Sequence, residues 1–280
     1  MNIIKFIESF TDDNLYTSQA SRRQSFGNML NIGKKGALAA VPGGLLSLML
    51  VPQKGSASVL APLSDSTPVQ SLQLALTLEY LDSTFYQMGL DQAGLIPEGR
   101  DRIVFTKIVQ NENAHKAALI SALNSLGSGN VIPAPNFDFT AGGMFDPFNN
   151  YDQFLALSQA FEDTGVRAYK GQAHNLMATP EILKTSLQIH SAESRQASEV
   201  RRLRGVKGWI TNNWIDADMN PAQQPVYNGE EMTTQMNFNT TTVNNGTNGP
   251  SVPATAASEA FDEPLTRPQV EAIASMFIAT

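Results

Sequence analysis

Cysteine is absent from the 280-residue chain, and its absence excludes disulfide bonds, thiolate metal sites and catalysis by a cysteine nucleophile. Charged residues make up only 16% of the chain, with a formal net charge of -7. Because no basic stripe interrupts this acidic balance, we expect no nucleic-acid partner. Histidine is scarce too: the chain has three. Two of them, His115 and His190, lie three residues from a glutamate in a helical pattern, which marks them as candidate metal ligands.

The first 60 residues are typical of an export signal. The stretch Ser21-Arg22-Arg23-Gln24-Ser25-Phe26 resembles a twin-arginine motif, and two lysines precede an apolar run at 36–51. This run is short for a membrane span and contains Pro42-Gly43-Gly44, so the hydrophobic region of a signal fits it better than a transmembrane helix. We therefore expect export to the periplasm or cell envelope. The alternative is an uncleaved segment, which would be the protein's only contact with a membrane.

Apolar residues recur at helical spacing in four segments between residues 67 and 207. The first segment follows Asp65-Ser66-Thr67-Pro68, a helix cap with a first-turn proline, and the second ends at Gly127-Ser128-Gly129. A long connection rich in Pro, Gly and Asn, 131–150, separates the first two segments from the last two. The pattern predicts two helix hairpins, with helices at about 69–92, 100–126, 151–178 and 181–204.

Each predicted helix carries one glutamate on its apolar face. Glu79 and Glu112 are 33 positions apart, and Glu162 and Glu193 are 31 positions apart. In an antiparallel hairpin, residues at equal distance from the turn lie at equal height, so we expect each pair to be level near the middle of the bundle. Four carboxylates buried together would repel one another severely without cations. Two divalent ions would supply four positive charges, which match four glutamates.

Glu112 lies three residues before His115, so the two side chains share one face of the second helix. Glu-x-x-His is the contribution of two of the four helices in di-iron carboxylate bundles. The fourth helix supplies Glu193 but has Gln196 where its histidine would be, and a glutamine carbonyl is a poorer ligand than imidazole. His190, one turn before Glu193, is the alternative ligand. A helix-capping or core hydrogen bond is its other expected role.

These residues and their neighbours resemble the ferritin-like domain family of exported bacterial proteins that includes desiccation-related proteins. The resemblance covers roughly residues 67–204 and the last twenty of the chain. It implies an all-α fold, a ferritin-like up-down four-helix bundle with a long crossover connection, and a metal-binding fold without a settled reaction. The stretches that carry the resemblance are 76–81, 111–115, 137–139, 161–165, 192–196 and 261–266.

The ligand pattern predicts two iron ions, with manganese as the alternative metal. Because Gln196 stands in the place of a histidine, a second alternative is that one of the two metal positions is empty. No other catalytic residue and no obligate small-molecule cofactor is predicted. The candidate metal ligands are Glu79, Glu112, His115, Glu162, Glu193, Gln196 and His190. Aromatic residues near them in sequence, such as Tyr86 and Tyr169, are expected to be core packing.

Residues 208–280 are predicted to form an irregular C-terminal extension. A Thr-, Asn- and Gly-rich stretch at 229–250 indicates a long loop or short strands. A final helix is expected after Leu265-Thr266-Arg267-Pro268, with an apolar face that packs on the bundle. Arginines at 167, 195, 201, 202 and 204 are expected on solvated faces or at helix ends, with Arg195 as a candidate partner for a bundle carboxylate.

Two functions from different classes fit this sequence. In the first, the protein is a metal-binding oxidoreductase of ferroxidase or peroxidase type, whose irons react with dioxygen or peroxide. In the second, it is a non-catalytic stress- or desiccation-related envelope protein that retains the bundle with a degenerate metal site. Gln196 favours the second hypothesis and the four level carboxylates favour the first. Homo-oligomerisation is open.

Overall fold

Four long helices form the body of the protein in the computed structural model, which describes residues 66–127, 129–243 and 252–279. The predicted export segment, residues 1–60, lies outside these ranges. The third helix ends earlier than expected because a short 3₁₀ turn, η2 (Ala173–Leu176), follows it. The four helices are α4 (Pro68–Asp91), α5 (Arg100–Ser125), α6 (Tyr151–Gln172) and α7 (Pro180–Leu203).

Local sequence signals start these helices. Thr67 caps α4: its hydroxyl accepts a hydrogen bond from the Gln70 backbone N–H, while the Gln70 side chain accepts one from the Thr67 N–H. This capping box satisfies two backbone donors that a helix start otherwise leaves free. Gly99 precedes α5 with a φ of 101°, a backbone conformation that glycine adopts without strain. The Asn150 side chain caps α6 by accepting from the Gln153 N–H.

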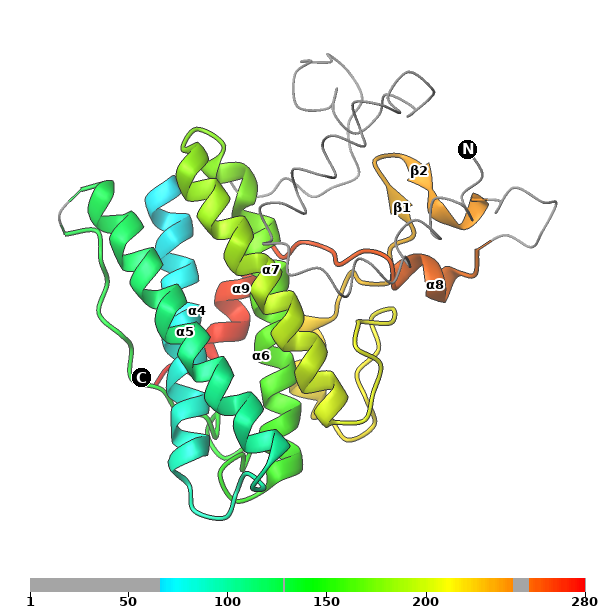
Figure 1. The fold of residues 1–280 in the computed structure, drawn as a ribbon. Helices are drawn as coiled ribbons and strands as arrows, with labels where there is room; N and C mark the ends of the chain where they lie inside the picture. The colour runs from blue at the N-terminus through cyan, green and yellow to red at the C-terminus, as the bar shows by residue number, and fades with distance from the viewer. Residues whose placement is uncertain (1–65, 128, 244–251, 280) are drawn as a thin grey trace, which may run out of the picture. The chain divides into compact units, whose positions relative to one another are not determined.

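The helices form two hairpins, α4 with α5 and α6 with α7, and the hairpins meet through α4 with α6 and α5 with α7. Between the hairpins, the chain returns along the length of the bundle, so α5 and α6 point in the same direction (Figure 1). This is the expected crossover connection, at 126–150. The all-α four-helix bundle with a long crossover connection predicted from the sequence is confirmed.

The core changes character along the bundle. Near the α4–α5 turn it is aromatic, and Phe85 stacks on Phe154 with ring centroids 4.8 Å apart. Toward the opposite end it is mostly aliphatic, with Leu72, Leu76, Leu119 and Leu123 among its buried members. Glu79, Glu112, Glu162 and Glu193 are buried between these two apolar regions along their helices. This order places a polar layer across the middle of an otherwise apolar core.

The C-terminal extension contains short elements and one final helix that packs on the bundle. β1 pairs with β2 antiparallel, with Thr234 opposite Asn239. The final helix contacts both α4 and α6. Within the described ranges, no helix is long and apolar enough to cross a bilayer. The elements are η3 (Pro221–Val226), β1 (Thr234–Gln235), β2 (Phe238–Asn239), η4 (Thr240–Thr242), α8 (Ala254–Ser258) and α9 (Arg267–Ser275).

Three arginines that were expected on solvated faces or at helix ends have buried side chains. Arg201 and Arg204 do lie at the end of α7, but the prediction is wrong for Arg167, which lies within α6. Arg167 is 1% exposed and pairs with Glu230 at 2.7 Å. Arg201 pairs with Asp163, and the Arg204 side chain is 3% exposed. The C-terminal extension explains the error, because it covers this face of the bundle with carbonyl groups and carboxylates. Periodicity within one helix contains no information about a segment that folds over it from elsewhere in the chain.

Candidate metal centre

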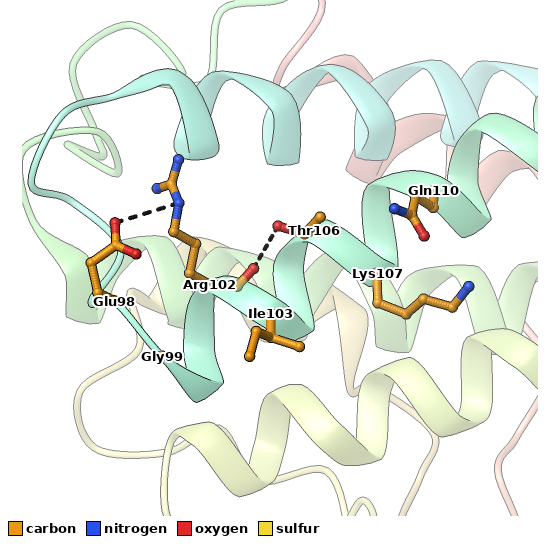
Figure 2. Close-up of a pocket in the computed structure, with 7 residues that line it drawn as sticks. All are labelled: Glu98, Gly99, Arg102, Ile103, Thr106, Lys107 and Gln110. Carbon is orange, nitrogen blue, oxygen red and sulfur yellow. Dashed lines mark hydrogen bonds and ion pairs between the residues drawn. The ribbon is translucent and has the colours of Figure 1, made fainter.

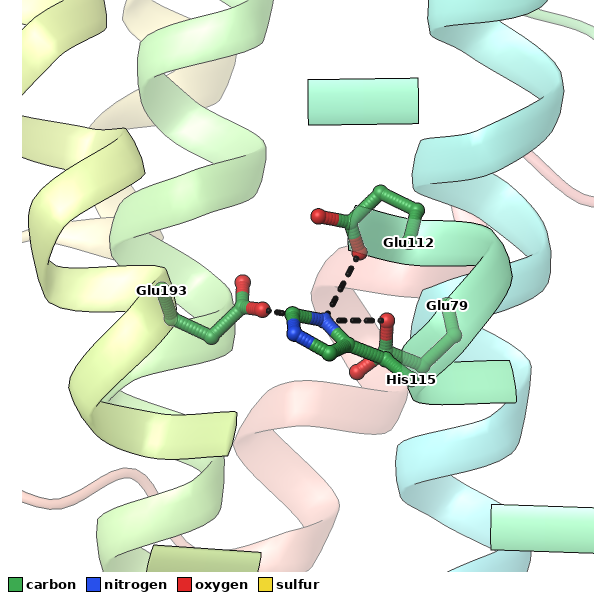
Figure 3. Close-up of side chains that lie close together, drawn as sticks. All are labelled: Glu79, Glu112, His115 and Glu193. Carbon is green, nitrogen blue, oxygen red and sulfur yellow. Dashed lines mark ion pairs between the residues drawn. The ribbon is translucent and has the colours of Figure 1, made fainter. Parts of the chain in front are cut away.

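A cluster of three carboxylates and one imidazole lies in the middle of the bundle (Figure 3). Glu79 comes from α4, Glu112 and His115 come from α5, and Glu193 comes from α7. One oxygen of each carboxylate and one ring nitrogen of the histidine all lie within 4.8 Å of one another. The three carboxylates are at most 1% exposed and His115 is 9% exposed. The sequence argument that placed these residues at one height is consistent with this geometry.

The Nδ1 atom of His115 is the meeting point of the cluster. It lies 3.3 Å from Glu79 Oε2, 3.4 Å from Glu112 Oε2 and 3.0 Å from Glu193 Oε1. Although these distances are short, the angles do not suit hydrogen bonds. All four of these atoms lack a hydrogen-bond partner among the described residues.

Four buried polar atoms without hydrogen-bond partners carry a large desolvation penalty, which is greatest for ionised groups. A single divalent cation can satisfy all four at once. Carboxylate oxygens with one imidazole nitrogen suit iron or manganese, and the donor set does not exclude zinc. The residues present therefore fit a metal ion, and the cluster is a buried group that can bind one.

Two of the other carboxylate oxygens of the cluster accept hydrogen bonds from protein donors. Tyr169 donates its hydroxyl hydrogen to Glu79 Oε1, and the Gln196 amide donates to Glu112 Oε1 at 2.6 Å. Each of these two glutamates thus has one oxygen fixed by a protein donor and one oxygen facing His115. Such outer hydrogen bonds orient ligands and tune their basicity.

Electrostatics within the cluster are strongly perturbed. Burial raises the pKa of Glu79 and of Glu193, and the negative charge of Glu112 raises both further. Burial also acts to raise the pKa of Glu112, but His115 and the other neighbours outweigh it and lower that pKa. For His115, burial acts to lower the pKa, and the three surrounding carboxylates overcome it and raise the pKa far above its ordinary value. A cation that binds here must displace the protons that these groups retain.

Glu162 and Gln196 lie beside the cluster. The Gln196 amide nitrogen is 2.6 Å from Glu112 Oε1 and 3.4 Å from Glu162 Oε2. Tyr86 donates its hydroxyl hydrogen to Glu162 Oε1 at 2.6 Å. Both oxygens of Glu162 therefore have protein donors, in contrast to the glutamates that face His115.

The two remaining histidines are outside the cluster. His190 is half-buried, and its Nδ1 lies 3.0 Å from the backbone carbonyl oxygen of Val166, which is the core hydrogen bond expected as its alternative role. His174 lies beyond the end of α6, with Nδ1 3.0 Å from the Gly171 carbonyl oxygen. His115 therefore lies among the carboxylates, whereas His190 and His174 each hydrogen-bond a backbone carbonyl group.

A family model described as a ferritin-like domain matches residues 67–206. The chain belongs to the ferritin-like domain family. No curated protein matches the chain. The matched segment extends from the Thr67 cap through α7, so this ferritin-like domain includes the whole cluster together with Glu162 and Gln196. The narrower expectations, a desiccation-related type and export, stay predictions.

Two residues of the ferritin-like domain shape the centre but were not identified from the sequence. Asp82, one turn after Glu79, is 4% exposed, and its Oδ1 has no partner within the described part of the chain. Burial raises the pKa of Asp82, and the charges of Glu112 and Glu79 raise it further. Gly165 gives room to Glu193: a Cβ atom at this position would lie 2.8 Å from Glu193 Oε2. The three-residue spacing from Glu79 was a usable signal for Asp82.

An open depression of about 530 Å³ lies on the surface of α5, away from the cluster (Figure 2). Its seven lining residues are exposed or half-buried, and Arg102 pairs there with Glu98 at 3.5 Å. Ile103, which is 70% exposed, lies in its centre. The side chains around this depression are solvated, whereas those of the cluster are buried and converge on one point. The buried cluster is therefore the functional candidate of this ferritin-like domain. The lining residues are Glu98, Gly99, Arg102, Ile103, Thr106, Lys107 and Gln110.

Proposed function

We propose that this ferritin-like domain binds a redox-active divalent metal, iron or alternatively manganese, at the buried cluster. The observation that carries the proposal is the convergence of four buried ligand atoms within 4.8 Å, none of which has a hydrogen-bond partner among the residues described. A merely structural polar layer would be expected to join its members by hydrogen bonds of good geometry. The ligands are Glu79, Glu112, His115 and Glu193.

A bound iron or manganese ion would supply one-electron chemistry toward dioxygen or peroxide, including the oxidation of ferrous iron. The protein's own residues prepare the site for it. Burial in the bundle excludes bulk water from the carboxylates. Tyr169 fixes Glu79 and the Gln196 amide fixes Glu112, so neither carboxylate is free to rotate away from His115. The sequence predicts two ions, and two of its candidate ligands, Glu162 and Gln196, lie beside this cluster.

The test is anaerobic loading of the purified protein with ferrous iron, followed by elemental analysis of the metal bound per chain. We expect stoichiometric binding in the wild type and its loss in His115→Gln. His190→Gln is the matched control, because the ring of this histidine hydrogen-bonds a backbone carbonyl on a neighbouring helix and lies outside the cluster. This variant should bind metal as the wild type does. Equal binding in the two variants, or none in the wild type, would contradict the proposal.

A second function, a non-catalytic protein that uses metal for stability, is favoured by one observation. Gln196 replaces the second histidine, and its amide already satisfies Glu112 and Glu162. Admission of air to the iron-loaded protein separates the two functions. An oxygen-dependent change in the iron absorption spectrum supports the redox function, whereas a higher melting temperature with an unchanged spectrum supports the structural one.

Export to the cell envelope is also a proposal, supported by the twin-arginine-like stretch at 21–26 and the apolar run that follows it. Cell fractionation tests it. The wild type should reach the envelope fraction, and a variant with Arg22→Lys and Arg23→Lys should stay inside the cell. If both proteins are distributed equally between the envelope and the cell interior, the two arginines do not direct export.

A further inference from the structure

The two halves of the polar layer differ in how their ligand atoms are satisfied. Around His115, one oxygen each of Glu79, Glu112 and Glu193 has no partner in the described part of the protein. In the other half, Glu162 accepts hydrogen bonds on both oxygens, from Tyr86 and from Gln196. A cation would relieve the first half. In the second half Glu162 has protein donors in place of a cation, and the neighbouring Asp82 has one oxygen, Oδ1, without a partner among the described residues.

Gln196 lies between Glu112 and Glu162, and Asn111 hydrogen-bonds its amide on the side away from these carboxylates. Its Nε2 donates to Glu112 Oε1 at 2.6 Å, while its Oε1 accepts from the Asn111 amide nitrogen at 2.7 Å. A primary amide has two donor hydrogens on nitrogen and only acceptor capacity on oxygen. Because the Asn111 amide supplies a donor, the Gln196 oxygen faces Asn111 and its NH₂ group faces the carboxylates.

We infer that the centre binds one metal ion per chain, at Glu79, Glu112, His115 and Glu193, and that the Gln196 amide, oriented by Asn111, replaces a second cation. The inference rests on the proposed metal binding and deepens it. An NH₂ group presents partial positive charge to the two carboxylates and excludes a cation from the same space. For Gln196 to become a ligand, its amide must turn over, which loses the Asn111 bond and sets the NH₂ groups of Gln196 and Asn111 face to face.

This arrangement makes Asn111 a positioning residue, and its replacement by aspartate is the sharpest test. An ionised aspartate has almost the shape of asparagine but only accepts hydrogen bonds. In Asn111→Asp the Gln196 NH₂ group therefore turns toward residue 111, and its carbonyl oxygen turns toward Glu112 and Glu162. That oxygen is a ligand for iron or manganese. The variant should gain a second ion.

The experiment measures manganese bound per chain by calorimetry and elemental analysis. The proteins are the wild type, Asn111→Asp and the control Asn113→Asp, which adds the same charge at an exposed position on the same helix. We expect one ion in the wild type and the control, and two in Asn111→Asp. Gln196→His, which restores an imidazole, should also bind two and provides a second route if the first variant does not fold.

The outcomes separate this inference from the proposed function. One ion in the wild type and two in either gain-of-site variant support the inference. Two ions in the wild type overturn it and leave metal binding intact. Asp82, whose Oδ1 has no partner among the described residues, would then be a candidate ligand of the second ion. One ion in the wild type and in both folded variants also overturns the role of the Gln196 amide. No ion in the wild type overturns the proposed function itself.

Discussion

Gly165 illustrates how one absent side chain creates space for a ligand. A Cβ atom there would lie 2.8 Å from Glu193 Oε2, which is closer than van der Waals contact. We predict that Gly165→Ala displaces the Glu193 carboxylate and weakens metal binding about tenfold or more, the range seen when ligand orientation is disturbed. The measurement is a dissociation constant from competition with a chelator.

Folding provides the control for this substitution. Alanine favours a helix over glycine by about 1 kcal/mol, so Gly165→Ala should keep its helical content and unfold at a similar temperature. An unchanged metal affinity in the folded variant would show that the Glu193 carboxylate can move without weakening metal binding. It would contradict the prediction that Gly165 is needed to position this ligand.

Two buried tyrosines allow a matched comparison. Tyr169 donates to the cluster ligand Glu79, and Tyr86 donates to Glu162 in the other half of the layer. If one ion binds at His115, Tyr169→Phe should weaken its binding by about tenfold, and Tyr86→Phe should have a much smaller effect. Isothermal titration with manganese measures both. Equal losses in the two variants would indicate that Glu162 also contacts the metal.

At the residue scale, helical spacing predicted that the glutamates lie level and that Glu112 and His115 share a face, because positions three or four apart share a face. Other residues required the structure. Asn111 has no unusual spacing, and its importance depends on a side chain 85 positions later in the chain. The sequence could likewise not decide between a core hydrogen bond and metal ligation for His190, since both fit the same helix face.

At the scale of elements, Gly89 sets how closely α4 approaches α6. A Cβ atom on Gly89 would lie 2.3 Å from a ring carbon of Phe154, and this ring is fully buried and stacked on Phe85. We predict that Gly89→Ala destabilises the protein by about 1–3 kcal/mol, as overpacking of a tight core does. Urea unfolding measures the change.

Gln87→Ala serves as the comparison for Gly89→Ala, because Gln87 is exposed two positions earlier on the same helix. It should change stability by less than about 0.5 kcal/mol. Combining Gly89→Ala with Phe154→Leu should recover part of the loss if the clash is the cause. Stability in Gly89→Ala equal to that of the wild type would mean that the aromatic cluster repacks freely.

Helix starts were the most predictable elements, since the Thr67-Pro68 cap and the Pro180 first turn are local signals. The end of α6 was placed too late, because η2 continues a helix-like pattern with 3₁₀ geometry. Short elements of the extension, such as β1 and β2, have two residues each. Periodicity over so few residues is not informative.

At the scale of the whole molecule, the C-terminal extension is held to the bundle by buried polar contacts as well as by α9. Arg167 donates to the backbone carbonyl oxygen of Glu263 at 2.7 Å and to that of Asn228 at 2.9 Å. Gly171 lets the extension approach α6 closely, because a Cβ atom at this position would overlap the carbonyl oxygen of Leu265. The extension therefore acts as part of the bundle's core, which no single-helix pattern could reveal.

Glu230 gives this contact a pH dependence. It is 1% exposed and pairs with Arg167, and its Oε2 has no partner among the described residues. Burial raises the pKa of Glu230 from 4.5 to about 8, although Arg167 opposes the change. Between these two values the folded protein holds a proton that the unfolded chain has released. Stability contributed by this group therefore falls as the pH rises from about 4.5 to about 8.

We predict that Glu230→Gln removes this component of the pH dependence. The glutamine resembles the protonated carboxyl, so the variant and the wild type should have similar free energies of unfolding near pH 5. Above pH 8 the wild type should be the less stable of the two, because its carboxyl is then ionised while buried. Urea unfolding of both proteins at pH 5, 7 and 9, with a chelator present throughout, isolates the effect from the metal centre. A constant difference between the two proteins across this range would show that Glu230 is already ionised at pH 5 and that its pair with Arg167 outweighs burial.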